Sequence, residues 1–133
     1  MARTTMPPLR SSALISVVDD DPAVAEAVVS LLESVGLSAV GFGSAEAFLG
    51  STQMAETVCL ILDVRMPGMG GLELQRKMAA DGNRTPVVFM TGHREIDVAT
   101  EALRRGAAAF LMKPFSQESL LDAVHSAITT LPT

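Results

Sequence analysis

Four places in the chain carry residue types suited to phosphoryl transfer. Residues 19–21 are consecutive aspartates, and Asp63, Thr91 and Lys113 each end or follow an apolar run. Two carboxylates about 5 Å apart repel by roughly 3 kcal/mol at an effective dielectric of about 20, so a carboxylate cluster needs a bound cation or bound protons. Oxygen ligands without histidine or cysteine favour a hard divalent ion, and a site with few protein ligands plus water suits Mg²⁺.

An acidic Mg²⁺ site beside a lysine and a hydroxyl is an arrangement for phosphoryl transfer. One carboxylate can be the nucleophile and form an aspartyl phosphate. Metal and lysine then neutralise the developing oxygen charge, and the hydroxyl can hydrogen-bond the phosphoryl group. Each residue alone has a simpler interpretation, such as a helix cap for Asp21 or a loop residue for Asp63. The hypothesis therefore depends on whether the fold brings these residues together.

The elements that position these residues alternate between strands and helices. Short apolar runs predict strands over residues 14–18, 37–42, 58–62, 86–90 and 108–112. Capping residues and helical periodicity predict five helices: one capped by Asp21 and closed by Gly36, one capped by Ser44, one over 71–80, one over 95–105, and one capped by Ser116.

Apolar strands joined by helices predict a parallel sheet covered on both faces. The expected fold class is α/β, a flavodoxin-like (βα)5 three-layer sandwich with strand order 2-1-3-4-5. In this order residues 19–21, Asp63, Thr91 and Lys113 all lie at carboxyl ends of strands that open onto one crevice. That shared location, more than any single residue, favours the functional interpretation.

Length and composition limit the class of protein. With 133 residues, 48% of them hydrophobic, the chain fits one domain with a real core. A net charge of −5 argues against a nucleic-acid or anionic-membrane surface, and the single cysteine, Cys59, excludes an intrachain disulfide. We expect a cytoplasmic protein without a membrane segment, with a flexible arm (1–12), one domain (13–130) and a tail or linker start (131–133).

Four motifs carry a family resemblance: residues 17–21 (VVDDD), 62–71 (LDVRMPGMGG), 90–93 (MTGH) and 113–115 (KPF). With them, the chain resembles the receiver domain of bacterial two-component response regulators over about residues 14–128. The Arg-Met-Pro run and the Met-Thr-Gly-His segment are most similar to the FixJ branch of the FixJ/NarL-type regulators.

The resemblance implies a role for each matching residue. Asp63 is the phosphoacceptor and a ligand of Mg²⁺. Asp20 binds Mg²⁺ directly, Asp19 acts largely through water, and the backbone carbonyl of Arg65 is a further protein ligand. Lys113 holds the phosphoryl group.

The resemblance also implies a switch. Thr91 supplies the switch hydroxyl, and Phe110 is the aromatic residue that moves with it, although core packing alone is an alternative role for Phe110. The bond from Lys113 to Pro114 is typically cis in this family. The face that changes consists of the predicted helix 95–105, the fifth strand and the fifth helix.

The function implied is that of a phosphoacceptor and not of an enzyme, although it assists its own phosphorylation and dephosphorylation. A sensor histidine kinase is the expected donor. The expected outcome is homodimerisation or control of an attached DNA-binding, transcription-regulating domain. No contact with nucleic acid or membrane is expected from this segment itself, and a stand-alone single-domain regulator is the alternative.

Three other classes of protein compete with this interpretation. A haloacid-dehalogenase-type phosphatase needs a second aspartate two residues after the nucleophile, where this chain has Arg65. A dinucleotide-binding module needs a glycine-rich loop after the first strand, where residues 19–21 would repel phosphate. A receiver that only docks, without phosphorylation, stays open because only chemistry distinguishes it.

Overall fold

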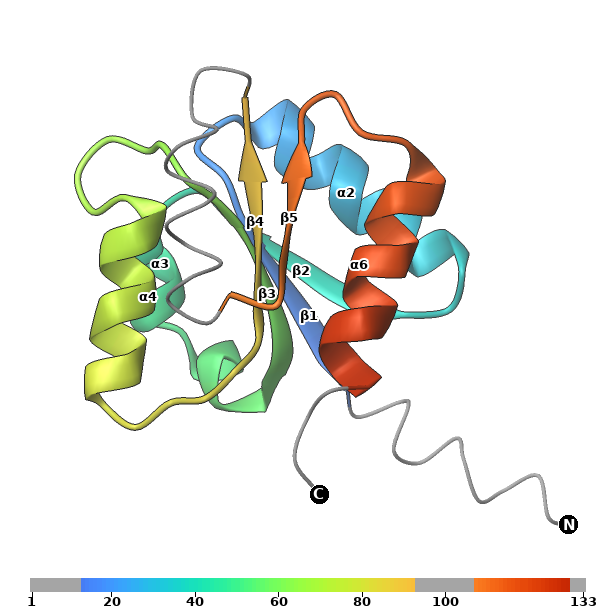
Figure 1. Cartoon of the computed structure of the whole chain (residues 1–133). Coiled ribbons are helices and arrows are strands. Elements are labelled where there is room, and N and C mark those ends of the chain that lie inside the picture. Colours follow the sequence, from blue (N-terminus) through green and yellow to red (C-terminus); the bar gives the residue numbers. More distant parts are fainter. Residues whose placement is uncertain (1–12, 93–106, 130–133) are drawn as a thin grey trace, which may run out of the picture.

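The computed structural model describes residues 13–92 and 107–129, which form a three-layer α/β fold (Figure 1). Its strands are β1 (Leu14–Val18), β2 (Ser38–Phe42), β3 (Thr57–Asp63), β4 (Val87–Thr91) and β5 (Ala109–Met112). All neighbouring strands are parallel, in the order β2-β1-β3-β4-β5. The predicted fold class and strand order are confirmed.

Helices cover both faces of the sheet. Helices α2 (Pro22–Ser34) and α6 (Gln117–Thr129) lie on one face, and α3 (Ala45–Leu49) and α4 (Gly71–Ala80) lie on the other (Figure 1). A 3-10 helix, η2 (Thr52–Glu56), precedes β3, and at five residues it is too short to show a periodicity. The predicted helix 95–105, arm (1–12) and tail (131–133) lie outside the described residues.

Strands β1, β3 and β4 are mostly apolar because successive residues enter two different cores. Val17 and Ile61 belong to the cluster under α2 and α6. Val18 and Leu62 belong to the cluster under α3 and α4. Each fully buried side chain of this size stabilises the fold by roughly 1.5–3 kcal/mol. The well-packed sheet therefore holds the residues at the carboxyl ends of its strands in fixed positions.

Predicted helix starts are confirmed at three capping residues. The Asp21 side chain accepts a hydrogen bond from the Ala23 N–H at 3.0 Å. Ser44 accepts from the Ala47 N–H at 3.0 Å, and Ser116 accepts from the Ser119 N–H at 3.0 Å. Capping depends on residues close in sequence, which is why the sequence predicts it well.

Two strands extend one residue past their apolar runs, which confirms Asp63 and Thr91 as strand ends. The runs end at residues 62 and 90, and β3 and β4 continue to Asp63 and Thr91. The reason is pairing: Asp63 lies opposite Met90, and Thr91 lies opposite Met112. Both polar residues are thus held by the sheet itself and are not carried on a loop.

Candidate functional site

Three aspartates and a lysine meet at the carboxyl ends of β1, β3 and β5. Asp19 and Asp20 follow β1, Asp63 ends β3, and Lys113 follows β5. Carboxylate oxygens of the three aspartates all lie within 4.8 Å of one another. The convergence predicted from the strand ends is therefore observed for these four residues.

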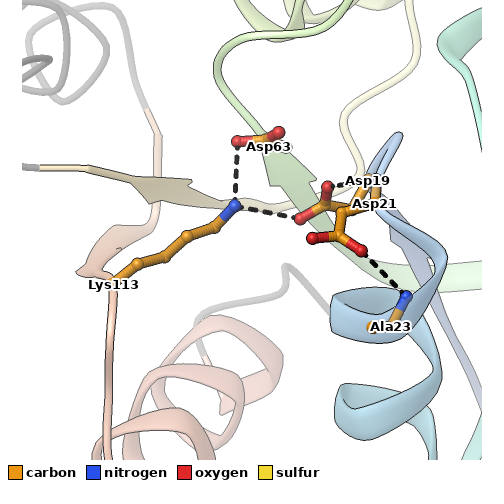
Figure 2. Close-up of polar contacts among 5 residues, drawn as sticks. All are labelled: Asp19, Asp21, Ala23, Asp63 and Lys113. Atoms are coloured by element: carbon orange, nitrogen blue, oxygen red, sulfur yellow. Dashed lines mark hydrogen bonds and ion pairs between the residues drawn. The ribbon is translucent and has the colours of Figure 1, made fainter.

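Lys113 bridges two of the carboxylates, as Figure 2 shows. Its Nζ atom donates to Asp19 Oδ2 at 3.1 Å and to Asp63 Oδ1 at 3.4 Å. The Asp19 and Asp63 side chains are only 1% and 10% exposed, against 30% for Lys113. Charge-assisted hydrogen bonds between side chains that are largely buried are stronger than ion pairs on a solvent-exposed surface.

In the loop after β1, Asp19 and Asp21 have different roles: Asp19 faces the cluster, and Asp21 caps a helix. Asp19 Oδ1 accepts a hydrogen bond from the backbone N–H of Asp21 at 2.9 Å, while Asp21 itself caps α2 through Ala23 (Figure 2). The interpretation of Asp21 as a helix cap is thereby confirmed. Asp20, between them, is exposed and gives the cluster an oxygen ligand that solvent can reach.

Burial and charge shift the pKa values of the two central groups. Burial, and then the charge of Asp19, raise the pKa of Asp63 to about 6, although Lys113 partly opposes them. For Lys113, burial alone lowers the pKa, but the hydrogen bond to Asp19 and the charge of Asp63 outweigh it, so the pKa is raised. At neutral pH Asp63 is mostly ionised and Lys113 is charged.

The donor set fits a hard divalent cation. Three carboxylates close together carry more negative charge than one ammonium group neutralises, and all the ligand atoms are oxygens. Arg65 is exposed two residues beyond Asp63. The role of its backbone carbonyl stays a prediction.

Thr91 and Lys113 are linked through the backbone. Thr91 is buried, its hydroxyl donates to the Gly92 carbonyl at 3.2 Å, and its own carbonyl accepts from the Lys113 N–H at 2.7 Å. The Lys113–Pro114 bond is cis, as the resemblance implies. Phe110 lies half-buried on β5, opposite Phe89, and packs against the cluster under α3 and α4. Packing accounts for this position, and the switch role of Phe110 stays a prediction.

Two residues that the sequence does not single out also shape the site. Gly71 starts α4 so close to Asp63 that a Cβ atom would lie 2.4 Å from the Asp63 carbonyl oxygen. Glu46, on α3, accepts a hydrogen bond from the Met69 N–H at 3.2 Å. The Gly70-Gly71 pair is a sequence signal for a close approach, whereas nothing near Glu46 in the sequence indicates its partner.

Residues 15–125 match the family model described as the response regulator receiver domain. The chain belongs to this family. The receiver domain is 47% identical over 119 residues to the response regulator protein TmoT of Ectopseudomonas mendocina, covering 90% of this chain and 54% of that protein. It is 43% identical over 114 residues to the transcriptional regulatory protein FixJ of Azorhizobium caulinodans, covering 86% and 54%.

Solved structures agree with this assignment. The receiver domain superposes on the crystal structure of FixJ-N with a TM-score of 0.83 and 32% identity, covering 91% of this chain and 97% of that one. The resemblance to two-component receivers, with FixJ among the relatives, is confirmed. The family match also decides against the phosphatase and the dinucleotide-binding module.

The receiver domain spans about half the length of the curated relatives it matches. Across residues 13–92 and 107–129, no helix combines the length and apolar character that crossing a membrane requires.

Proposed function

We propose that this receiver domain is a phosphorylation switch in which Asp63 takes a phosphoryl group from the phosphohistidine of a sensor histidine kinase. The observation that carries the proposal is the shared position of Lys113, whose ammonium group contacts both Asp63 and Asp19. The Asp63 carboxylate is largely buried, yet it stays mostly ionised at neutral pH. A nucleophilic carboxylate must be ionised.

Mg²⁺ is the proposed metal. Asp20, Asp63 and the Arg65 carbonyl would hold it, with Asp19 acting largely through water, and the close carboxylate cluster supports this assignment. When bound, Mg²⁺ neutralises charge on the transferred phosphoryl oxygens.

The protein contributes two groups to the transfer, Asp63 and Lys113, beside the Mg²⁺ that their site would hold. A carboxylate oxygen of Asp63 bonds to phosphorus while the phosphorus–nitrogen bond breaks, and that electron pair returns to the kinase imidazole. Lys113 then binds a phosphoryl oxygen and reduces its charge. The domain accepts a group and assists its own phosphorylation and dephosphorylation, without turning over a separate substrate.

The oxygens of the phosphoryl group on Asp63 then start the conformational switch. The Thr91 hydroxyl leaves the Gly92 carbonyl and donates to the phosphoryl group, and Phe110 turns into the space this vacates. The face formed by β5, α6 and the predicted helix 95–105 then changes, which shifts the population toward a state that dimerises or releases an attached domain.

For the whole protein we propose a cytoplasmic regulator with the receiver at residues 13–130, between an arm (1–12) and a linker start (131–133). A DNA-binding, transcription-regulating domain is the proposed output. Its support is that relatives named as transcriptional regulators are about twice as long as the matched region. The net charge of −5 favours DNA contact through that domain and not through this one.

The test is phosphorylation by acetyl phosphate with Mg²⁺, read as intact mass. Wild-type protein and the control Asp81→Asn, at an exposed aspartate that ends α4, should each gain one phosphoryl group. Asp63→Asn should gain none, and omission of Mg²⁺ should abolish the gain. An adduct that persists in Asp63→Asn would refute the assignment of the phosphoacceptor.

A further inference from the structure

The segment 64–70 joins the proposed phosphoacceptor to α4 and carries Arg65, whose carbonyl is the proposed metal ligand. Its first residue is tied to the sheet, because the Val64 N–H donates to the Met90 carbonyl at 3.0 Å. The residue after the segment is tied to the segment's start, because the N–H of Gly71, the first residue of α4, donates to the Val64 carbonyl at 3.0 Å. These two bonds leave the middle of the segment to be held by other contacts.

Glu46 supplies such a contact from a different element. Its Oε2 atom accepts a hydrogen bond from the Met69 N–H at 3.2 Å, across 23 residues of sequence. The neighbouring Gly68 has a φ of +74°, and a Cβ atom there would lie 3.1 Å from the same Oε2 atom. A left-handed glycine thus lets the backbone reach the carboxylate where a side chain would crowd it.

Helix α3, which carries Glu46, is anchored to the core of the domain. Ser44 caps the helix, and Phe48 is completely buried against the sheet. The Phe48 ring also packs edge-on to Phe42, with centroids 5.4 Å apart and planes at 72°. Because α3 is anchored in the core, its contact with Met69 transmits the position of the core to the exposed segment.

We propose that Glu46 is a positioning residue of the phosphorylation site: it holds the backbone of segment 64–70, and through it the Arg65 carbonyl, in the conformation that binds the divalent cation. This inference rests on the proposed function, because that function assigns segment 64–70 its role in binding Mg²⁺. The competing role for Glu46 is a favourable charge in the first turn of α3, which needs no contact with Met69.

Calorimetric titration of the unphosphorylated protein with Mg²⁺ tests the proposal. Glu46→Ala should weaken Mg²⁺ binding about three- to tenfold, the range for losing one ordinary hydrogen bond. Glu46→Gln should stay within about twofold of wild type, because its amide oxygen still accepts from Met69. Hydrogen exchange at the Met69 amide should quicken in Glu46→Ala only.

Glu56 provides the matched control, since it is an exposed glutamate at the opposite end of β3. Glu56→Ala and Glu56→Gln should bind Mg²⁺ like wild type, and circular dichroism establishes that every variant is folded. Wild-type affinity in Glu46→Ala would overturn the proposal. Equal losses in Glu46→Ala and Glu46→Gln would also overturn it, because charge and not position would then be responsible.

The same titrations separate this inference from the proposed function. If the affinities follow the expected series but wild-type protein accepts no phosphoryl group from acetyl phosphate or a histidine kinase, only the proposed function fails. If wild-type protein binds no Mg²⁺, both fail.

Discussion

The ammonium group of Lys113 contacts the Oδ2 atom of Asp19 at 3.1 Å, although 94 residues separate the two in the chain. Its contact with the proposed phosphoacceptor, Asp63, is longer at 3.4 Å. Asp19 therefore keeps the lysine in the site before any phosphoryl group arrives. A cation already shared between two anions needs only a small movement to meet new negative charge.

Removing this shared cation should destabilise the fold at neutral pH. Lys113→Met leaves Asp19 and Asp63 as buried neighbours of like charge. Because Lys113 is 30% exposed, we expect a loss of about 2 kcal/mol in the free energy of unfolding, less than for a fully buried pair. Urea unfolding at pH 7 without Mg²⁺ measures it, with Lys113→Arg as the charge-conserving control. Equal stability of Lys113→Met and wild type would contradict this account of the pair.

The raised pKa of Asp63 makes stability depend on pH. The folded state holds the Asp63 proton up to about pH 6, whereas the unfolded chain releases it near 3.8. This contribution to stability is complete below about pH 4 and is lost as pH rises through 6. Ionised Asp63 then costs the folded state up to about 3 kcal/mol.

Asp63→Asn should therefore be more stable than wild type at pH 7 in EDTA, by about 1–3 kcal/mol, and the difference should vanish near pH 4. Chemical unfolding at both pH values, followed by circular dichroism, gives the comparison. A difference that stays constant between pH 4 and 7 would show that the substitution acts through packing and not through ionisation.

Mg²⁺ should stabilise the folded domain by binding the carboxylates of Asp19, Asp20 and Asp63. At a concentration about 100 times its dissociation constant, a ligand that binds only the folded state adds about 2.7 kcal/mol. We expect thermal unfolding of wild type and of Asp81→Asn to shift upward with Mg²⁺, and Asp20→Asn to show less than half of that shift. A full shift in Asp20→Asn would remove this residue from the metal site.

Gly71→Ala should disturb the site through the backbone. The new Cβ atom would lie 2.4 Å from the Asp63 carbonyl oxygen, so the start of α4 or the end of β3 must move. We expect a loss of about 1–3 kcal/mol in unfolding free energy, together with slower phosphorylation by acetyl phosphate. Gly50→Ala is the control, since its Cβ would meet only the Glu46 carbonyl at 3.5 Å. Unchanged stability and rate in Gly71→Ala would show that the contact relaxes without cost.

Features that depend on near neighbours were predictable from the sequence. Asp21 and Ser44 cap their helices as expected, because a cap needs only the next two or three residues. The ends of β3 and β4 at Asp63 and Thr91 were predictable too, because each of these residues directly follows an apolar run. Pairing with the neighbouring strand keeps them in the sheet, as Asp63 pairs with Met90.

The order of the five strands and the polar residues at their ends could be predicted from the sequence alone. For parallel strands, these two facts suffice to bring Asp19, Asp63 and Lys113 to one edge of the sheet. The three-dimensional structure was needed to show that Lys113 lies nearer Asp19 than Asp63, and that Glu46 accepts a hydrogen bond from the Met69 amide. It was also needed to show that burial raises the pKa of Asp63 to about 6. Those properties arise from distances and lost water between segments far apart in the chain, which no local pattern of residues encodes.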